Sequence, residues 1–425
     1  MAFTSYAAPE ELLGTGRYVL ATYCLQAPSG ADIGRLAEKF AVGQTVGTWV
    51  ELPTITDQMR ELYQGKIAGI QEVPPRDIAA DGQEQSFFLI RIAFPHINFG
   101  RSFAALLTTL LGNDASTSVQ AKLVDLHFPE EYAQQFPGPK FGIKGLREKL
   151  QVPKRPLLLN MIKPCLGFTP ETGAEIFYAT ALGGVDIIKD DELLTNPSYL
   201  PVEERIKAYT QARDRAYGET GKRTAYFVNI TDRLPDMLEH AKRAADLGAD
   251  GLMVNFVFSG LDALAALAAD PQIQLPILAH YAGSGPWIES TSTGMDSLVY
   301  LGKLARLAGA DIVLYNTPYG GYPYLRSKYM QMARLLSQPY YSIRPAMPAV
   351  GGGVTPGMVP TLVKELGMDL VLAAGGSIQG HPLGTTSGAK AMLQAIEAVA
   401  QGLDLQTAAQ ESPELRIALE KWGQI

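Results

Sequence analysis

The apolar residues in the second part of the chain fall into eight short, unbroken runs. The runs begin near residue 155 and read PLLLNMI, GVDIIKD, TAYFVNI, GLMVNFVF, LPILAHY, ADIVLYN, PAMPAV and DLVLAAG. Unbroken runs are typical of parallel strands that are buried on both faces. The stretches between them, such as HAKRAADLG and LVKELG, have helical spacing and end at glycine. Eight such units favour a (β/α)8 TIM barrel; a doubly wound open sheet is the alternative.

The first part of the chain has a different pattern. The strand-like runs RYVLATYCL, SFFLIRIAF and AKLVDLHF are mixed with a helical segment near residues 101–112. Strands and helices in irregular order indicate an α+β domain. We therefore predict an N-terminal α+β domain over residues 1–148 and a C-terminal barrel over residues 149–425, and a chain of 425 residues is long enough for two domains.

Composition narrows the classes of protein that remain. Apolar residues make up 47% of the chain and charged residues 19%, which fits a folded protein with a large core. A net charge of −7 without a long basic run makes nucleic acid an unsuitable partner. No apolar stretch has the roughly 18 residues of a membrane span, and we see no signal peptide. Two cysteines cannot form a disulfide framework, so we expect a reducing, cytoplasmic location.

Charged residues follow directly after the second barrel run. Side chains alternate along a strand, so Lys189 and Asp191 point the same way, and Glu192 can turn towards them from the start of the loop. Carboxylates grouped in this way, with Asp190 as the third, suit a hard cation such as Mg²⁺. A neutral lysine amine can also add carbon dioxide and become a further oxygen ligand. The alternative is a surface turn held by ion pairs.

Other candidate groups follow the first, fifth, seventh and eighth runs. Lys163 ends the first run and His280 ends the fifth. Burial beside a cation is expected to lower the pKa of Lys163 and to suit it to proton transfer. Glycine clusters at Gly351–Gly353 and Gly375–Gly376 follow the last two runs. Because glycine lets backbone N–H groups approach a phosphate closely, these clusters indicate a phosphate site.

Two of these segments resemble the large chain of ribulose bisphosphate carboxylase (RuBisCO). GGVDIIKDDE resembles the segment of that family in which the lysine is carbamylated and binds Mg²⁺ together with the Asp and Glu that follow. The resemblance implies that Lys189 carries CO₂ as a carbamate and that Asp191 and Glu192 are the other metal ligands. IKPCLG resembles the family segment whose first lysine handles substrate protons, here Lys163, although Cys165 stands in place of the second lysine.

The resemblance extends over about residues 17–410 and implies the RuBisCO architecture, with a ferredoxin-like N-terminal domain. VGTW at Val46–Trp49 is similar to the family's STGTW, which implies that Thr48 and Trp49 line the phosphate site of a partner subunit. Asn113 matches an asparagine that reaches the neighbour's active site, and His280 matches an active-site histidine. The implied assembly is a homodimer, or a multimer of dimers, with shared active sites.

Several positions depart from the carboxylating members of the family. Gly321 stands near the lysine of the loop that holds carbon dioxide, and the assisting N-terminal glutamate is replaced around Gly43 and Gln44. Tyr281 replaces an arginine, and Gly351 replaces a serine. Because these changes affect carboxylation and one phosphate site, the resemblance implies a RuBisCO-like protein that forms an enolate without fixing carbon dioxide.

The implied activity is that of the methionine-salvage branch, which enolises 2,3-diketo-5-methylthiopentyl 1-phosphate. Tyr319 and Tyr322 could pack against the methylthio tail of this small phosphorylated keto-sugar substrate, or against their own loop. Asn113 departs from that branch, which uses a lysine base there, so the base would be Lys163 or the carbamate. The alternatives are a 5-methylthioribulose-1-phosphate isomerase, a sugar-acid-phosphate decarboxylase, a true carboxylase using Lys328, or a catalytically silent barrel.

Overall fold

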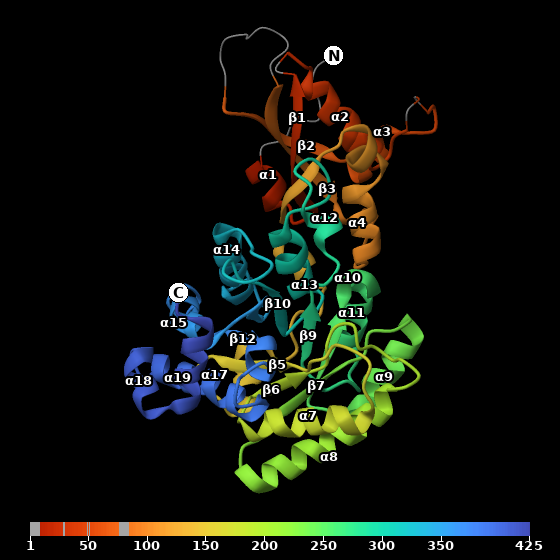
Figure 1. Cartoon of the computed structure of the whole chain (residues 1–425). Helices are drawn as coiled ribbons and strands as arrows, with labels where there is room; N and C mark the ends of the chain where they lie inside the picture. Colours follow the sequence, from red (N-terminus) through yellow and green to blue (C-terminus); the bar gives the residue numbers. More distant parts are fainter. Residues whose placement is uncertain (1–8, 29, 49, 51, 76–84) are drawn as a thin grey trace. The chain divides into compact units, whose positions relative to one another are not determined.

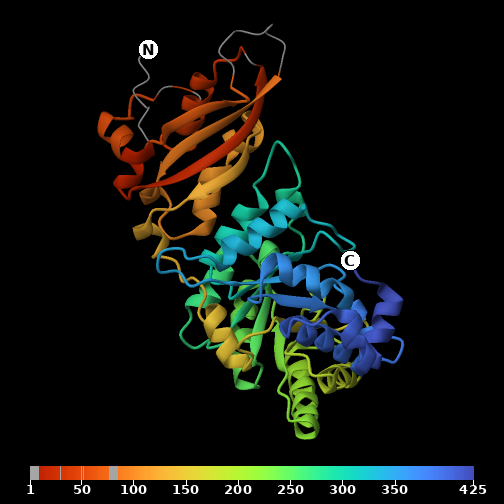
Figure 2. The same ribbon diagram turned by 90° about the vertical axis from the view of Figure 1, so that its left-hand side faces the viewer.

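The chain divides into two compact units. The computed structural model describes residues 9–28, 30–48, 50, 52–75 and 85–425. The first unit contains the described residues up to Phe136 together with residues 283–304, and the second contains residues 137–282 and 305–425. Figures 1 and 2 show both units from two directions. None of the described helices combines the length and the apolar character that crossing a membrane requires.

The first unit is built on an antiparallel sheet of four strands in the order β2-β3-β1-β4. The strands are β1 (Tyr18–Pro28), β2 (Lys66–Val73), β3 (Gln85–Pro95) and β4 (Lys122–His127). The helices are α1 (Pro9–Gly14), α2 (Ile33–Gly43), α3 (Asp57–Tyr63), η1 (His96–Asn98), α4 (Phe103–Leu111), η2 (Asp114–Ser118), α5 (Glu130–Ala133), α12 (Gly285–Ile288) and η3 (Leu298–Leu304). The order of strands and helices confirms the predicted ferredoxin-like domain.

Strand β2 is the element of this sheet that the apolar pattern did not predict. Its sequence, KIAGIQEV, is interrupted by glycine, which is unfavourable in a strand interior. The pairing of β2 with β3 shifts register between Ile67 and Gly69. The irregularity therefore lies at the glycine, and it breaks the alternation from which a strand is predicted.

The second unit is a closed barrel of parallel strands, as predicted. The strands are β5 (Leu157–Met161), β6 (Ile187–Lys189), β7 (Ala225–Asn229), β8 (Gly251–Asn255), β9 (Ile277–His280), β10 (Ile312–Asn316), β11 (Met347–Gly351) and β12 (Val371–Ala374). Each lies in one of the eight apolar runs, and β12 pairs with β5 to close the barrel. Side chains from all eight strands meet in one core. Burial on every side explains why the runs are unbroken.

Helices surround the barrel, and Figure 1 shows α7 and α8 side by side on its outside. The helices of this unit are α6 (Gly142–Leu150), α7 (Pro170–Leu182), α8 (Val202–Thr220), α9 (Leu234–Asp246), α10 (Phe256–Ser259), α11 (Leu261–Ala269), α13 (Ala305–Leu307), α14 (Arg326–Ser337), η4 (Pro356–Met358), α15 (Val359–Leu366), α16 (Gly376–Gln379), α17 (Thr385–Ala400), α18 (Leu405–Glu411) and α19 (Pro413–Trp422).

Three buried aspartates hold the amino-terminal end of the barrel. Each lies directly before a strand: Asp186 before β6, Asp250 before β8 and Asp311 before β10. Each accepts a hydrogen bond from a backbone N–H of the preceding strand: from Leu158 at 2.8 Å, Tyr226 at 3.0 Å and Ile277 at 2.9 Å, respectively. These carboxylates satisfy backbone donors at one end of the barrel and leave the opposite end free for other chemistry.

Candidate active site at the carboxyl ends of the barrel strands

A pocket of about 310 Å³ lies at the carboxyl ends of the barrel strands. It brings together most of the barrel residues that the sequence singled out: Lys163, Glu192, His280, Gly351, Gly352, Gly353, Gly375 and Gly376. Its other lining residues are Met161, Tyr281, Leu314, Asn316, Gly321, Tyr322 and Ala373. Residues from six separate strands or the loops after them thus converge on one cavity, which is where the chemistry of such barrels is found.

Lys189 is the last residue of β6, and its side chain is completely buried. Its Nζ donates to the backbone carbonyl of Asp190 at 2.9 Å and lies 3.5 Å from Oε2 of Glu192. Burial lowers the pKa of the Lys189 ammonium below its ordinary value, although the neighbouring carboxylates oppose this shift. Burial therefore shifts this amine towards the neutral form, which is the form of lysine that reacts with carbon dioxide.

Lys163 follows β5 and forms an ion pair with Asp191. Its Nζ lies 2.5 Å from Oδ2 of Asp191 and 3.1 Å from Sγ of Cys165. Partial burial lowers the pKa of Lys163, but the hydrogen bonds to Asp191 and Cys165 outweigh burial and hold the pKa above its ordinary value. The expected lowering was for a lysine beside a bound cation, and the sequence did not show that Asp191 would contact the ammonium and oppose it. Lys163 carries a proton at the edge of the pocket.

His280 ends β9 and is almost fully buried. Burial, followed by the nearby charge of Lys189, lowers the pKa of His280 well below its ordinary value, so the ring is neutral. Nδ1 lies 3.2 Å from the backbone N–H of Ala282 and accepts its hydrogen bond. The proton of the neutral ring is then on Nε2, which lies 3.4 Å from Oε2 of Glu192.

Asp190 does not line the pocket, whereas Glu192, two residues later, does. Its carboxylate is fully buried and faces Arg205 of α8, whose Nε lies 3.0 Å away. The hydroxyl of Tyr226 and the backbone N–H of Asn229 also donate to it, at 3.0 and 2.8 Å. Of the three carboxylates in the Lys-Asp-Asp-Glu segment, two are therefore left to hold a cation.

The donor set fits a hard divalent cation if Lys189 is carbamylated. Within the described parts of the chain, no three His, Cys, Asp or Glu side chains come close enough together to hold a metal. Asp191 and Glu192 supply oxygen atoms, and the third nearby group is the amine of Lys189, a poor ligand for Mg²⁺. A carbamate would turn that amine into an oxygen donor, and the lowered pKa of the buried Lys189 assists this change.

The glycine clusters form two neighbouring turns beside this segment. Gly352 and Gly353 have φ values of +85° and +109°, which residues with side chains rarely adopt. A Cβ on Gly352 would meet the side chain of Asn316. Oγ of Ser377, in the turn that begins at Gly375, donates to the carbonyl of Val354 at 2.7 Å. The two turns are therefore joined, and both line the pocket.

The loop after β10 supplies two residues to the pocket. Gly321 and Tyr322 line the pocket, and Tyr322 is 75% exposed. The hydroxyl of Tyr319 instead donates a hydrogen bond to Oε1 of Glu365 at 2.6 Å. This tyrosine is therefore held by the neighbouring helix α15 and does not line the pocket. Lys328 lies in helix α14.

Tyr281 and Asn316 form a polar contact that sequence reasoning missed. The Tyr281 hydroxyl donates to Oδ1 of Asn316 at 2.5 Å, and the Tyr281 ring stacks on His280. Burial raises the pKa of Tyr281 to about 12, so the hydroxyl is neutral. Asn316 could have been found, because it is the polar last residue of an apolar run.

Two of the predicted N-terminal residues share a pocket in the first unit. Thr48 and Asn113 both line a cavity of about 590 Å³ at the ends of α2 and α4. Trp49, the third predicted residue of this domain, lies outside the described residues. The structure thus brings Thr48 and Asn113 together within their own unit.

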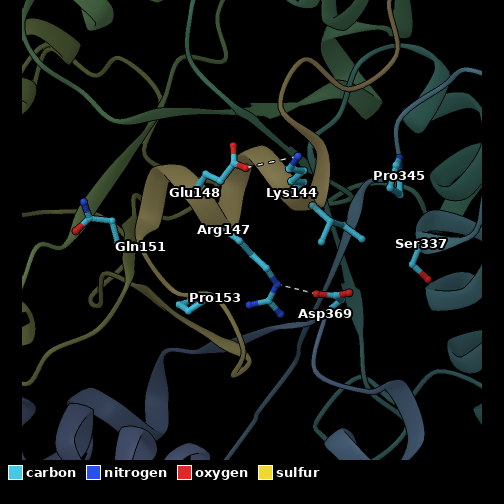
Figure 3. A pocket seen from close by; sticks show the side chains of 9 residues that line it. Lys144, Arg147, Glu148, Gln151, Pro153, Ser337, Pro345 and Asp369 are labelled. Carbon is cyan, nitrogen blue, oxygen red and sulfur yellow. Dashed lines mark hydrogen bonds and ion pairs between the residues drawn. The ribbon is translucent and has the colours of Figure 1, made fainter.

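A larger pocket, of about 840 Å³, lies at the amino-terminal end of the barrel beside α6 (Figure 3). Its central cation, Arg147, is already engaged: Nε donates to Asp369 at 2.7 Å, and the other two nitrogens donate to the carbonyls of Val152, Arg155 and Met368. Figure 3 shows the guanidinium of Arg147 directed at Asp369. The arginine of this pocket therefore joins parts of the fold to one another and is not directed at a ligand.

Comparison with known proteins agrees with this geometry. Residues 142–422 match the catalytic domain of the ribulose bisphosphate carboxylase large chain, and residues 9–132 match its N-terminal domain. A ribulose bisphosphate carboxylase-like protein from Archaeoglobus fulgidus is 44% identical over 96% of this chain and 94% of its own. A 2,3-diketo-5-methylthiopentyl-1-phosphate enolase from Geobacillus kaustophilus is 40% identical over 95% of this chain and 98% of its own.

Solved structures give the same result. The crystal structure of a rubisco-like protein (MtnW) from Alicyclobacillus acidocaldarius superimposes with a TM-score of 0.88 at 41% identity, and the match covers 96% of this chain and all of that one. Family models that together span most of the chain, and relatives at this level of identity, show its membership directly. The chain belongs to the ribulose bisphosphate carboxylase large-chain family, as one of its RuBisCO-like members.

Proposed function

We propose that this protein is a Mg²⁺-dependent enolase that acts on 2,3-diketo-5-methylthiopentyl 1-phosphate. The observation that carries the proposal is the composition of the barrel pocket. Glu192 and Lys163 line it together with glycine turns suited to one phosphate, and Lys163 is the one cationic side chain among the described lining residues. Asp191 is ion-paired with Lys163, and the buried Lys189 lies beside Glu192. The similarity to an enolase of that name supports the choice of substrate.

The metal would be held by Asp191, Glu192 and the carbamate of Lys189. Bound there, Mg²⁺ would polarise the substrate carbonyl and stabilise the negative charge of the enolate. Lys163 holds a proton at the pocket and is positioned to deliver it to the substrate oxygen. The neutral His280 can donate a hydrogen bond from Nε2 without adding charge.

The lining of the pocket suits a substrate with one phosphate and an uncharged tail. The glycine turns at Gly351–Gly353 and Gly375–Gly376 would bind the single phosphate through backbone N–H groups. Leu314 and Met161 add apolar surface to the lining, and Tyr281 offers a neutral hydroxyl. A methylthio group fits such surroundings, whereas a second phosphate would need a cation there.

The active site is proposed to be completed by a second copy of the chain. Thr48 and Asn113 share a pocket in the first unit, and the family resemblance assigns their equivalents to the partner's active site. A homodimer with two-fold symmetry would then contain two identical sites. Activity should depend on association, so dilution to monomers, followed by analytical ultracentrifugation and assay, should abolish it.

The experiment that tests the function is exchange of the substrate's acidic C–H in deuterated water. With Mg²⁺ and bicarbonate, NMR should show loss of that proton signal and formation of the enol product from the methylthio substrate. Chelation of the metal should stop the reaction. If 5-methylthioribulose 1-phosphate or a phosphorylated sugar acid reacts instead, the isomerase or decarboxylase alternative holds.

Carboxylation of ribulose 1,5-bisphosphate is not expected. Stabilising the developing carboxylate needs a positive charge, and Gly321 supplies none at the loop after β10. Incorporation of labelled carbon dioxide should remain at background. Turnover of ~1 s⁻¹ or more, which is ordinary for an enzyme, would contradict this reading of the loop.

A further inference from the structure

A carboxylate lies against a glycine in the pocket that contains Thr48 and Asn113. Gly43 is the last residue of α2, and Asp114, the residue after Asn113, is the first of the π-helical turn η2. A Cβ built on Gly43 would overlap Oδ2 of Asp114, far inside van der Waals contact. Any side chain at position 43 would therefore displace the carboxylate, so the glycine makes room for it.

Gln44 holds the backbone of Asp114 in this place. Its Nε2 donates to the carbonyl of Thr109, in α4, at 2.5 Å. Its Oε1 accepts a hydrogen bond from the backbone N–H of Asp114 at 3.2 Å. One side chain thus connects the end of α2 with both α4 and η2, and it positions the carboxylate of Asp114 beside Gly43. Single π-helical turns are rare and often occur at functional sites.

Asp114 opens onto the same cavity as the residues expected to meet the substrate. It lines the pocket of about 590 Å³ together with Thr48, Asn113 and Lys39, and it is half-buried. The amide of Asn113 is not a useful proton acceptor, whereas the carboxylate of the next residue is. If this pocket covers the partner's barrel, Asp114 is the carboxylate among its described lining residues and is ready to accept a proton without first losing one.

We propose that Asp114 is the base that removes the carbon-bound proton of the substrate in the partner's active site. The inference rests on the proposed function. The carboxylate takes the proton from the carbon beside the carbonyl, and the C–H electron pair becomes the C=C bond. The carbonyl π pair moves to its oxygen, which takes a proton from the Lys163 ammonium. Asp114 then releases its proton to water, and Lys163 regains one from water.

The first test replaces the carboxylate without changing its size. Asp114→Asn should lower the kcat for C–H exchange in deuterated water by ~10²–10⁴-fold and leave the KM within about threefold, as expected for loss of a positioned base. The exposed carboxylate Asp57, in the same unit, provides the matched control, because Asp57→Asn should exchange at the wild-type rate. In Asp114→Ala, added formate should restore part of the lost rate, which a structural role could not produce.

The second test uses the glycine. Gly43→Ala should lose activity like Asp114→Asn, because its methyl group would displace the carboxylate. Gly30→Ala should not, since a Cβ at that exposed position meets nothing. If the wild type exchanges while Asp114→Asn matches its rate, or if formate rescues nothing, Asp114 is not the base and the proposed function stands. If the wild type itself does not exchange, both proposals fail.

Discussion

Arg205 is a fully buried cation directly behind the Lys189–Glu192 segment. Its Nε lies 3.0 Å from Oδ2 of Asp190, and its other nitrogens donate to the carbonyls of Leu200, Thr195 and Asn229 at 2.9–3.1 Å. Neither Arg205 nor Asp190 has any exposed side-chain surface. The informative change is Arg205→Leu, which keeps an apolar stem in place and removes the charge and every one of these hydrogen bonds.

The expected loss of stability follows from what the change leaves behind. Asp190 would keep the hydrogen bonds from Tyr226 and Asn229, but it would be a buried carboxylate without a cation. Removing one partner of a buried pair costs about 3–5 kcal/mol, and carbonyls that lose their donors add to this. We expect a loss of about 4 kcal/mol in the free energy of unfolding. We also expect weaker Mg²⁺ binding, because Asp190 anchors the backbone between Lys189 and Asp191.

The assay is urea unfolding followed by circular dichroism and tyrosine fluorescence. Lys207→Leu, an exposed lysine on the same helix, is the matched control and should change stability by less than about 1 kcal/mol. In the double variant Arg205→Leu with Asp190→Asn, the uncompensated charge is gone, so its loss should be smaller than the sum of the single losses by about 1–3 kcal/mol. A loss below about 1 kcal/mol for Arg205→Leu, or additive losses, would refute the reasoning.

Three further changes test other parts of the structure. Lys163→Met should keep the fold and slow exchange of the substrate C–H by ~10²–10⁴-fold, measured by NMR; an unchanged rate would assign the proton transfer elsewhere. Burial raises the pKa of Asp311 to about 6 in the folded state, above its value of about 3.9 in the unfolded chain. The folded state therefore binds more protons between these values, so the stability of wild type relative to Asp311→Asn should fall by about 2 kcal/mol from pH 4 to pH 7; a constant difference would contradict this. Tyr281→Arg should tighten inhibition by a sugar bisphosphate by about 10-fold or more, whereas Tyr281→Phe should not; equal inhibition constants would show that the second phosphate lies elsewhere.

The barrel could be predicted from the sequence because its strands are buried on every side. Each of its eight strands coincides with an unbroken apolar run, and the polar residues at the run ends, such as Lys163 and His280, converge on one pocket. Strand β2 could not be predicted in the same way. Gly69 interrupts its pattern where the register shifts, and that irregularity is visible only in the pairing with β3.

Contacts between distant residues explain what the sequence could not show. Asp190 was grouped with the metal carboxylates because its neighbours are metal candidates. In the structure it forms an ion pair with Arg205, fifteen residues later. The ion pair between Lys163 and Asp191 joins two separate strand ends and opposes the expected lowering of the Lys163 pKa. Gly43 was considered only as part of the segment in which the glutamate of the family is replaced, because nothing in the sequence indicates that Asp114 lies against it.

The aspartates at the base of the barrel also define a modular construction. Each aspartate accepts a hydrogen bond from the preceding strand and lies directly before the next one. The amino-terminal ends of the strands are therefore linked as the pairs β5–β6, β7–β8 and β9–β10. A chain of this kind can be regarded as successive two-strand modules, each carrying its own fastening. New termini placed between two modules, for example in the connection from β6 to β7, would leave each of these hydrogen bonds within one continuous segment. A break between β5 and β6 would instead place Asp186 and Leu158, which it holds, on different segments.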